Sequence, residues 1–425
     1  MRVLVVADGT RGDVQPMTVL AQQLQREGQE ITFVGPPTFR SFVEGKGLCF
    51  EALPFDIESS VKAIGGAATS SALDKLRATP KIFVETSKGQ LEVLPALAKQ
   101  ADFILVGGIH GGVPTAAEYA RVPWRWVLYT SILYPSSSHP PLLSGVGRAP
   151  RFVNWLLWRL TRWLANRLFL KPINQRRASL QLPLIEDAGL SLLCKNPILA
   201  MEPELAPLPP EWPDADVIGY LDPGEGDPLP ADLEAFIERG PAPVYIGFGS
   251  MPDAHPRKTT ALFVEATRRA GVRAVISRGW ADFGGELPDH CFAVGPVSHP
   301  RLFARMAAIV HHGGAGTTAA AARAGKPQLI VPHIADQFFF GEQVRELGVG
   351  AAPIRRSWLR AGALAERLTQ LVNDESMRER AAQLGEKIRA RPRPENLSRL
   401  LVERPGATLP VMPLGRRVSL APPGM

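Results

Sequence analysis

The stretch that decides the fold runs from Ala307 to Val331 and reads AAIVHHGGAGTTAAAARAGKPQLIV. Its first part, 307–312, is an apolar run typical of a buried strand, and a glycine-rich turn follows. An alanine-rich helical segment then ends near Gly325, and 327–332 predicts another strand. This order of strand, glycine turn, helix and strand indicates a parallel sheet covered by helices.

The same alternation extends through both halves of the chain. Further strands are expected at 2–7, from Ile31, at 101–107, from Trp124, at 243–250 and at 272–277. A loop is expected at 8–13 and a helix at 14–27, where apolar residues recur at helical spacing. Two successive series of this kind predict an α/β protein of two Rossmann-like, doubly wound domains that face each other across a cleft.

Composition changes mark the expected domain boundaries. We expect a first domain at 1–215 and a second at 216–404, with the hinge in the proline-rich stretch 201–241. The remaining residues, 405–425, are rich in proline and glycine, and we interpret them as a mobile tail.

Composition also excludes several classes of protein. With 45% hydrophobic and 21% charged residues among 425, the chain is expected to fold, and no apolar run is long enough to span a membrane. Three distant cysteines argue against a disulfide framework or structural metal and fit a cytoplasmic protein. The net charge of +7 favours an anionic partner, or it serves only solubility. We do not expect nucleic-acid binding, because this charge is the only feature that would suggest it.

One basic, tryptophan-rich segment at 151–170 does not follow the alternation. At 3.6 residues per turn it forms a mostly apolar stripe, consisting of Phe152, Trp155, Leu156, Arg159, Trp163 and Leu164. Such a helix can lie on a membrane surface or face an acceptor. It can also pack its apolar side on its own domain with the arginines directed outward, which is the more common arrangement.

The glycine-rich turn is the strongest candidate for chemistry. Gly314 and Gly316 let the backbone approach a ligand closely, and the start of the following helix offers unpaired N–H groups. His312 and Thr317 would add hydrogen-bond donors. The set suits a diphosphate, although it matches neither the P-loop nor the dinucleotide-binding pattern. The alternative is a tight turn in which the histidines act only as caps.

Two further sites follow neighbouring strands. Asp336 and Gln337 come after 327–332, where a carboxylate and an amide can bind adjacent sugar hydroxyls, or Asp336 can cap the next helix. Ser250 ends 243–250 and would reach the same phosphates, unless the glycines there form an ordinary turn.

The segment from Val310 to Val344 closely resembles the nucleotide-sugar signature of Leloir glycosyltransferases with the GT-B fold. The stretches GTRGDVQP, from Gly9, and IGFGSM, from Ile246, agree with it. The chain is most similar to sterol glucosyltransferases and to glycopeptide and macrolide antibiotic glycosyltransferases. This resemblance implies that His312, Gly314, Gly316, Thr317 and Ser250 bind the diphosphate and that Asp336 and Gln337 hold the sugar. Arg301 stands where the sterol enzymes tend to have tryptophan, so the nucleobase is assigned to Arg278, Trp280 and Val297.

The resemblance also implies an inverting, metal-independent transfer with Asp13 as general base and no cofactor, because the nucleotide sugar is a co-substrate. Asp13 can alternatively cap the helix expected from Val14. The acceptor pocket is assigned to Asp8, Thr10, Arg11 and His110, with a structural role for His110 left open.

Function is therefore expected to be transfer of a hexose, with UDP-glucose as the default donor, to a hydroxyl of a hydrophobic acceptor such as a sterol or polyketide. The alternatives are a nucleotide-sugar epimerase of the same architecture and a non-catalytic sugar-nucleotide or lipid-binding protein. The protein is expected in the cytoplasm, with peripheral membrane contact as an open possibility.

Overall fold

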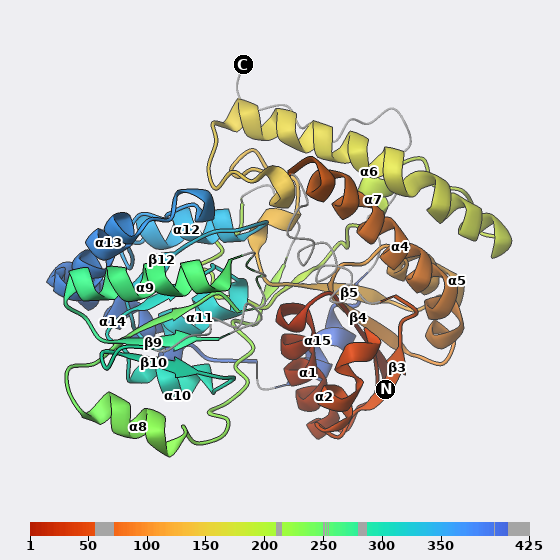
Figure 1. Cartoon of the computed structure of the whole chain (residues 1–425). Helices are drawn as coiled ribbons and strands as arrows, with labels where there is room; N and C mark the ends of the chain where they lie inside the picture. The colour runs from red at the N-terminus through yellow and green to blue at the C-terminus, as the bar shows by residue number, and fades with distance from the viewer. Residues whose placement is uncertain are drawn as a thin grey trace.

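Two parallel β-sheets, each covered by helices, make up the structure (Figure 1). It is a computed structural model that describes residues 1–55, 72–209, 215–249, 251, 253, 255–278, 287–394 and 396–406. The predicted mobile tail at 405–425 lies outside these residues except for its first two positions.

The first sheet has the strand order β3-β2-β1-β4-β5-β6-β7, and its neighbouring strands are parallel. Its strands are β1 (Arg2–Asp8), β2 (Glu30–Gly35), β3 (Cys49–Ala52), β4 (Phe103–Gly108), β5 (Trp124–Leu128), β6 (Ile198–Leu199) and β7 (Asp216–Val217). Its helices are α1 (Arg11–Arg26), α2 (Arg40–Glu44), α4 (Ala72–Ala98), α5 (Val113–Ala120), α6 (Arg151–Ser179) and α7 (Ala188–Ser191). β1 is buried from its second residue onward, as its unbroken apolar sequence predicts.

The second sheet has the order β10-β9-β8-β11-β12, again parallel. Its strands are β8 (Val244–Gly247), β9 (Ala274–Ser277), β10 (Cys291–Val294), β11 (Ile309–His311) and β12 (Gln328–Ile330). Its helices are α8 (Ala231–Glu238), α9 (Pro256–Ala270), α10 (His299–Ala304), α11 (Ala315–Arg323), α12 (Gln337–Glu346), α13 (Ala361–Asn373) and α14 (Glu375–Ala390). The prediction of two doubly wound α/β domains is confirmed.

Strand order reverses once in each sheet, between β1 and β4 and between β8 and β11. The loops that follow these four strands therefore diverge and leave a crevice at the carboxyl edge of each sheet, where open parallel sheets bind ligands. The candidate residues identified from the sequence follow these strands or lie close to them. The strand order thus indicates a binding site at the carboxyl edge of each sheet, where the sequence motifs also lie.

The domain boundaries differ from the expected ones. β7 pairs with β6, so the first sheet extends beyond residue 215, and the stretch expected to be the hinge contributes Met201, Leu205 and Ile218 to the core of the first domain. A last helix, α15 (Leu397–Glu403), also packs on the first domain, where Glu27 accepts hydrogen bonds from the backbone of Leu397 and Ser398 at 3.0 and 2.7 Å. The apolar residues at 397–401 provide the physical reason, because they complete the core beneath α1.

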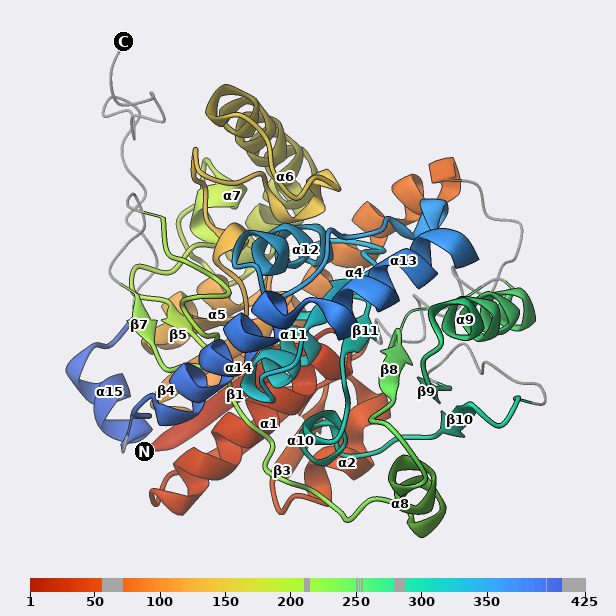
Figure 2. The same ribbon diagram turned by 90° about the vertical axis from the view of Figure 1, so that its left-hand side faces the viewer.

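The long helix α6 lies on the outside of the first domain, next to α7 (Figures 1 and 2). Trp158 is buried against the domain, whereas most of the predicted apolar stripe, including Phe152, Leu156 and Trp163, is exposed. The more common arrangement, with the stripe packed inward, is therefore wrong for these residues. No helix in the described part of the chain is long and apolar enough to cross a bilayer.

Candidate functional site

The site forms where α1 of the first domain and α11 of the second come into contact. α1 and α11 are in contact, and one apolar cluster contains Val6 and Trp126 of the first domain together with Phe340 and Ile388 of the second. The carboxyl edges of the two sheets therefore face each other at a packed boundary. This brings the loop after β1 close to the loops after β11 and β12.

Asp13 is held in the first turn of α1 by its local sequence. The helix begins at Arg11 rather than at Val14, with Thr10 as its N-cap, so Asp13 lies inside the helix. Its Oδ2 atom accepts a hydrogen bond from the Thr10 backbone N–H at 2.8 Å and from the Thr10 hydroxyl at 3.4 Å. The first of these bonds, together with the bond that the Thr10 side chain accepts from the Asp13 backbone, makes a capping box. Asp13 thus helps to cap the helix from within its first turn, whereas the prediction placed it before a helix that begins at Val14.

The surroundings of Asp13 leave no room for side chains on two neighbouring glycines. A Cβ atom on Gly9 would lie 2.2 Å from Oδ2 of Asp13, and one on Gly108 would lie 3.1 Å from Oδ1. Both glycines have positive φ angles. Burial raises the pKa of the Asp13 carboxyl to about 6, against the effect of the Thr10 hydrogen bonds. A carboxyl with this pKa can accept a proton near neutral pH.

Asp8 and His110 occupy buried positions in the first domain. The Nε2 atom of Gln90, on α4, donates to Asp8 Oδ2 at 2.8 Å and to the Ile109 carbonyl at 2.9 Å, while its Oε1 accepts from the Gly111 N–H. Gln90 therefore joins the end of β1 to the loop after β4. Sequence reasoning missed Gln90, because a lone glutamine in a helix gives no signal.

His110 packs edge-on against two tryptophans. Its ring centroid lies 4.3 Å from that of Trp126 and 5.5 Å from that of Trp124, and the side chain is only 6% exposed. Within the described residues neither ring nitrogen has a hydrogen-bond partner, and burial lowers the pKa of His110 to about 3. The structure thus places His110 in an aromatic core position, and its assignment to the acceptor pocket stays a prediction.

Arg11 and Thr10 lie at the domain boundary. The positive charge of Arg11 and, more strongly, burial lower the pKa of His299 on α10 to about 4, so Arg11 faces the second domain. The His299 ring is stacked on Phe303 with centroids 4.5 Å apart. His299 was not identified from the sequence as a site residue, because only the folded chain brings α1 and α10 together.

In the second domain, His311 supports the glycine-rich turn. Its Nδ1 accepts a hydrogen bond from the Gly313 N–H at 3.1 Å, and its Nε2 lies 2.9 Å from Oε1 of Gln328 on β12. This pairing requires the neutral form with the proton on Nε2. Burial agrees with it, because it lowers the pKa of His311 to about 4.

His312 lies between the turn after β8 and the start of α11. A Cβ atom on Gly249 would be 3.2 Å from its ring, and one on Gly314 would be 2.5 Å from its Nε2 atom. Burial and the neighbouring histidines lower the pKa of His312 well below its usual value. His312 is therefore a neutral hydrogen-bonding group at pH 7.

The start of α11 carries the predicted phosphate cradle. Gly314 is the N-cap and makes no side-chain cap, and the first intrahelical bond joins the Thr318 N–H to the Gly314 carbonyl at 2.9 Å. The N–H groups up to Thr317 therefore have no acceptor within the helix. A Cβ atom on Gly316 would meet open space. The turn thus presents backbone donors and the positive end of the helix dipole to any anion placed there.

Asp336 lies at the N-cap of α12 but makes no capping hydrogen bond with its side chain. The preceding residue, Ala335, has a φ of 54°, a strained conformation for a residue other than glycine. Burial and the charge of Asp13 raise the pKa of Asp336 to about 7. The two carboxyls, which belong to different domains, therefore lie near each other.

Gln337 is oriented by the loop that precedes it. Its Oε1 accepts hydrogen bonds from the backbone N–H groups of His333 and Ile334, at 2.7 and 3.0 Å. The amide oxygen is thus used within the protein, and its Nε2 contacts only the Met251 sulfur, at 3.6 Å, among the contacts found for the described residues. Only the amide N–H group remains for a sugar hydroxyl.

Of the three residues predicted to contact the nucleobase, the structure describes Arg278 and Val297, and the Arg278 backbone N–H donates to the Val294 carbonyl at 2.9 Å. Ser250 and Trp280 lie outside the described residues. Arg278 is exposed, and Val297 packs on the core near Leu302. Arg301 forms an ion pair with Glu225 at 2.9 Å. Arg301 thus points toward the segment before α8.

In the ranges that the structure describes, no group of three or more His, Cys, Asp or Glu side chains is arranged to hold a metal ion. Metal independence of the reaction stays a prediction.

Family models match both domains of the chain. Residues 3–122 match the glycosyltransferase family 28 N-terminal domain, and residues 274–404 match the C-terminal domain of the erythromycin biosynthesis protein CIII-like family. The two matches therefore cover the carboxyl edges of β1 and β4 and of β11 and β12.

Curated relatives match over most of the chain. The glycosyltransferase GtfE of Amycolatopsis orientalis is 37% identical over 360 residues, which are 83% of this chain and 86% of GtfE. The vancomycin aglycone glucosyltransferase of the same organism is 34% identical, over 87% of this chain and 90% of its own length. The sterol 3-beta-glucosyltransferase UGT80B1 of Arabidopsis thaliana is 32% identical, and the match spans 60% of that longer protein.

Solved structures share the fold at low sequence identity. The spinosyn forosaminyltransferase SpnP matches with a TM-score of 0.69 and 20% identity, over 95% of this chain and 98% of SpnP. The glycosyltransferase VinC, solved in complex with dTDP, matches with a TM-score of 0.65 and 23% identity over the same shares.

Proposed function

Since this chain belongs to the family of GT-B glycosyltransferases that includes antibiotic glycosyltransferases and sterol glucosyltransferases, we propose that it transfers a hexose from a nucleoside-diphosphate sugar to a hydroxyl group of a hydrophobic acceptor. The observation that carries the proposal is the contact of α1, which holds Asp13, with α11, whose first backbone N–H groups have no acceptor within the helix. Asp336 of the second domain lies near enough for the charge of Asp13 to raise its pKa. A base, a sugar-binding carboxyl and an anion site are the three parts that such a transfer needs.

In the proposed reaction, the acceptor oxygen attacks the anomeric carbon and its proton passes to Asp13. The bond between that carbon and the diphosphate oxygen breaks, and the electron pair leaves with the nucleoside diphosphate. The backbone N–H groups at the start of α11, with neutral His312, stabilise the negative charge that develops on the phosphates. Because attack and departure occur in one displacement, the product has the inverted anomeric configuration.

Donor and acceptor are proposed from the relatives. Two of the relatives described above are named as glucosyltransferases, one for the vancomycin aglycone and one for sterols, which favours glucose as the sugar and a natural-product aglycone or sterol as the acceptor. We propose UDP-glucose as the donor, and the dTDP complex of VinC makes dTDP-glucose the comparison to include.

The test is a screen of hydrophobic alcohols with UDP-glucose and dTDP-glucose, read by mass spectrometry. A product heavier by one hexose, with an anomeric configuration opposite to that of the donor by NMR, supports the proposal. An altered sugar nucleotide formed from the donor alone would instead identify an epimerase. Glycosylation of polar sugars but of none of the hydrophobic alcohols would contradict the acceptor class.

A further inference from the structure

The helix α6 exposes a continuous apolar face to solvent. Of the thirteen large hydrophobic side chains exposed in the described ranges, six lie on this helix: Phe152, Val153, Leu156, Leu160, Trp163 and Leu164. At about 100° per residue they fall within an arc of about 120° on one side of the helix. Phe152 and Trp163 are 67% and 57% exposed. Such a concentration on one element marks an interaction surface.

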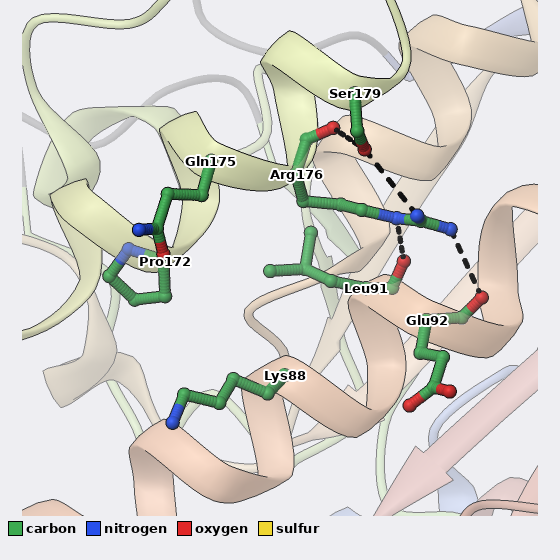
Figure 3. A pocket seen from close by; sticks show the side chains of 7 residues that line it. All are labelled: Lys88, Leu91, Glu92, Pro172, Gln175, Arg176 and Ser179. Carbon is green, nitrogen blue, oxygen red and sulfur yellow. Dashed lines mark hydrogen bonds between the residues drawn. The ribbon is translucent and has the colours of Figure 1, made fainter.

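The opposite side of α6 is fixed to the domain, so this face cannot turn inward. The Trp158 indole donates to the His139 carbonyl at 3.0 Å, and Ile173 packs in a buried cluster with Leu91. Figure 3 shows the Arg176 side chain extending from α6 to α4, where Nε donates to the Leu91 carbonyl at 2.8 Å. Beside this contact, Lys88 and Gln175 line a groove of about 310 Å³ between the two helices.

The charge on α6 has a single sign. Its 29 residues include seven arginines and lysines and no aspartate or glutamate. Arg162 and Arg177 are paired with Asp187 and Glu118 on neighbouring segments. For Arg159, Arg167 and Lys171, no carboxylate partner is found among the described residues. These side chains therefore add positive charge around the apolar face.

Arginine and tryptophan alternate along α6 in a way that suits a lipid–water interface. The Arg159 guanidinium lies 4.7 Å from the Trp155 ring centroid, and that of Arg167 lies 5.9 Å from the Trp163 ring centroid. Indole rings favour the headgroup level of a bilayer, and long basic side chains extend their charge to lipid phosphates while their apolar stems stay buried.

We propose that α6 docks the protein onto the surface of an anionic lipid bilayer, with the helix axis parallel to the membrane. The apolar face enters the boundary between headgroups and acyl chains, and Arg159, Arg167 and Lys171 contact the lipid phosphates. A second copy of the chain fits this surface poorly, because pairing of α6 with α6 would bring two basic helices without acidic residues together.

Vesicle co-sedimentation tests the proposal without any sugar donor, so its outcome is independent of the proposed reaction. The full chain is mixed with vesicles of phosphatidylcholine alone or with about one third phosphatidylglycerol. We expect binding to the anionic vesicles only, weakened by high salt. Quenching of tryptophan fluorescence by brominated lipids should accompany binding and decrease in Trp163→Gln.

Two double variants assign binding to α6. Arg159→Gln with Arg167→Gln should weaken binding about 30-fold, since each basic residue near an anionic surface contributes a factor of roughly five. Leu160→Gln with Trp163→Gln should weaken it about tenfold or more. The matched controls are Arg257→Gln with Lys258→Gln on α9 for charge and Trp358→Gln for apolar exposure, and both should bind like the wild type.

Three results would overturn the proposal: no binding to anionic vesicles, equal binding to neutral ones, or unchanged binding of both α6 variants with wild-type thermal unfolding. A change in oligomeric state caused by the α6 variants, with no change in vesicle binding, would assign the face to self-association instead.

Discussion

Asp13 of the first domain and Asp336 of the second lie close enough together for the charge of Asp13 to raise the pKa of Asp336. The domains are therefore packed so that the loop after β1 and the loop after β12 share one electrostatic environment. Two carboxyls with raised pKa values at the carboxyl edges of facing sheets are typical of a functional site, because such sites use burial and neighbouring charges to bring pKa values close to the working pH.

Asp13→Asn should reduce sugar transfer by about 100- to 10,000-fold, because the amide cannot accept the proton from the acceptor hydroxyl. Its oxygen can still accept the Thr10 hydrogen bond, and burial of the charge no longer opposes folding, so the variant should be at least as stable as the wild type above pH 6. Nucleoside-diphosphate affinity, measured by calorimetry, should stay near that of the wild type. Near wild-type turnover would remove Asp13 from the role of base.

The pH dependence of kcat/KM should follow the Asp13 carboxyl. Its pKa is raised to about 6 by burial, so the reactive carboxylate predominates above that pH. We expect kcat/KM to rise as pH increases through about 6 and then to level off. Initial rates at limiting acceptor concentration provide the measurement, and a profile flat from pH 5 to pH 7 would contradict the assignment.

Asp336→Asn should stabilise the protein above pH 7 and have little effect at pH 4. The pKa of Asp336 is about 7 in the folded chain, above its ordinary value of 3.8, so folding favours the protonated form. The stability linked to this proton is complete below about pH 4 and is lost as pH rises through 7. We expect a gain of about 1–3 kcal/mol at pH 8 by urea unfolding. An equal gain in the free energy of unfolding at pH 4 and pH 8 would show that the charge of the Asp336 carboxylate is not the cause.

His312→Gln should weaken nucleoside-diphosphate binding roughly tenfold or more, the range expected for a hydrogen bond to a charged group. Its folding stability should change little, since no hydrogen-bond partner is found for the buried Nδ1 atom within the described residues. Titration calorimetry with UDP and dTDP measures the effect. The control is His290→Gln, in the turn before β10, which should bind the nucleoside diphosphates like the wild type. Unchanged affinity in His312→Gln would show that His312 does not bind the phosphates.

Gly9→Ala should impair transfer more than Gly28→Ala, although both glycines have positive φ angles. A Cβ atom on Gly9 would lie 2.2 Å from the Asp13 carboxylate, whereas one on Gly28 would have nothing within 4 Å. Both substitutions carry the cost of a strained backbone, so comparing them isolates the displacement of Asp13. Equal loss of kcat in the two variants would mean that the position of Asp13 is unimportant.

The sequence predicted the strands that position the site, because buried parallel strands are continuous apolar runs and glycine turns mark their ends. It did not predict β6 and β7, which have two residues each and no usable periodicity. Nor did it show that α1 begins at Arg11, since a capping box at Thr10 and Asp13 is a weaker signal than the apolar repeat that starts at Val14.

Relationships between distant residues lay beyond sequence reasoning. His110 and Asp8 were assigned to the acceptor pocket from their positions after strands, yet His110 lies between tryptophans and Asp8 is bonded to Gln90. Burial of this kind depends on side chains far away in sequence. Likewise, only the folded structure shows that the charge of Asp13 raises the pKa of Asp336.

The attachment of α15 to the first domain matters for engineering. The polypeptide passes from the first domain to the second and returns after α14, where Glu27 holds the start of α15. Chimaeras that exchange acceptor-side and donor-side halves between related enzymes with a single junction would separate α15 from the surface that it covers. A chimaera should therefore use two junctions, one before α8 and one after α14, so that residues 397–406 come from the same parent as α1.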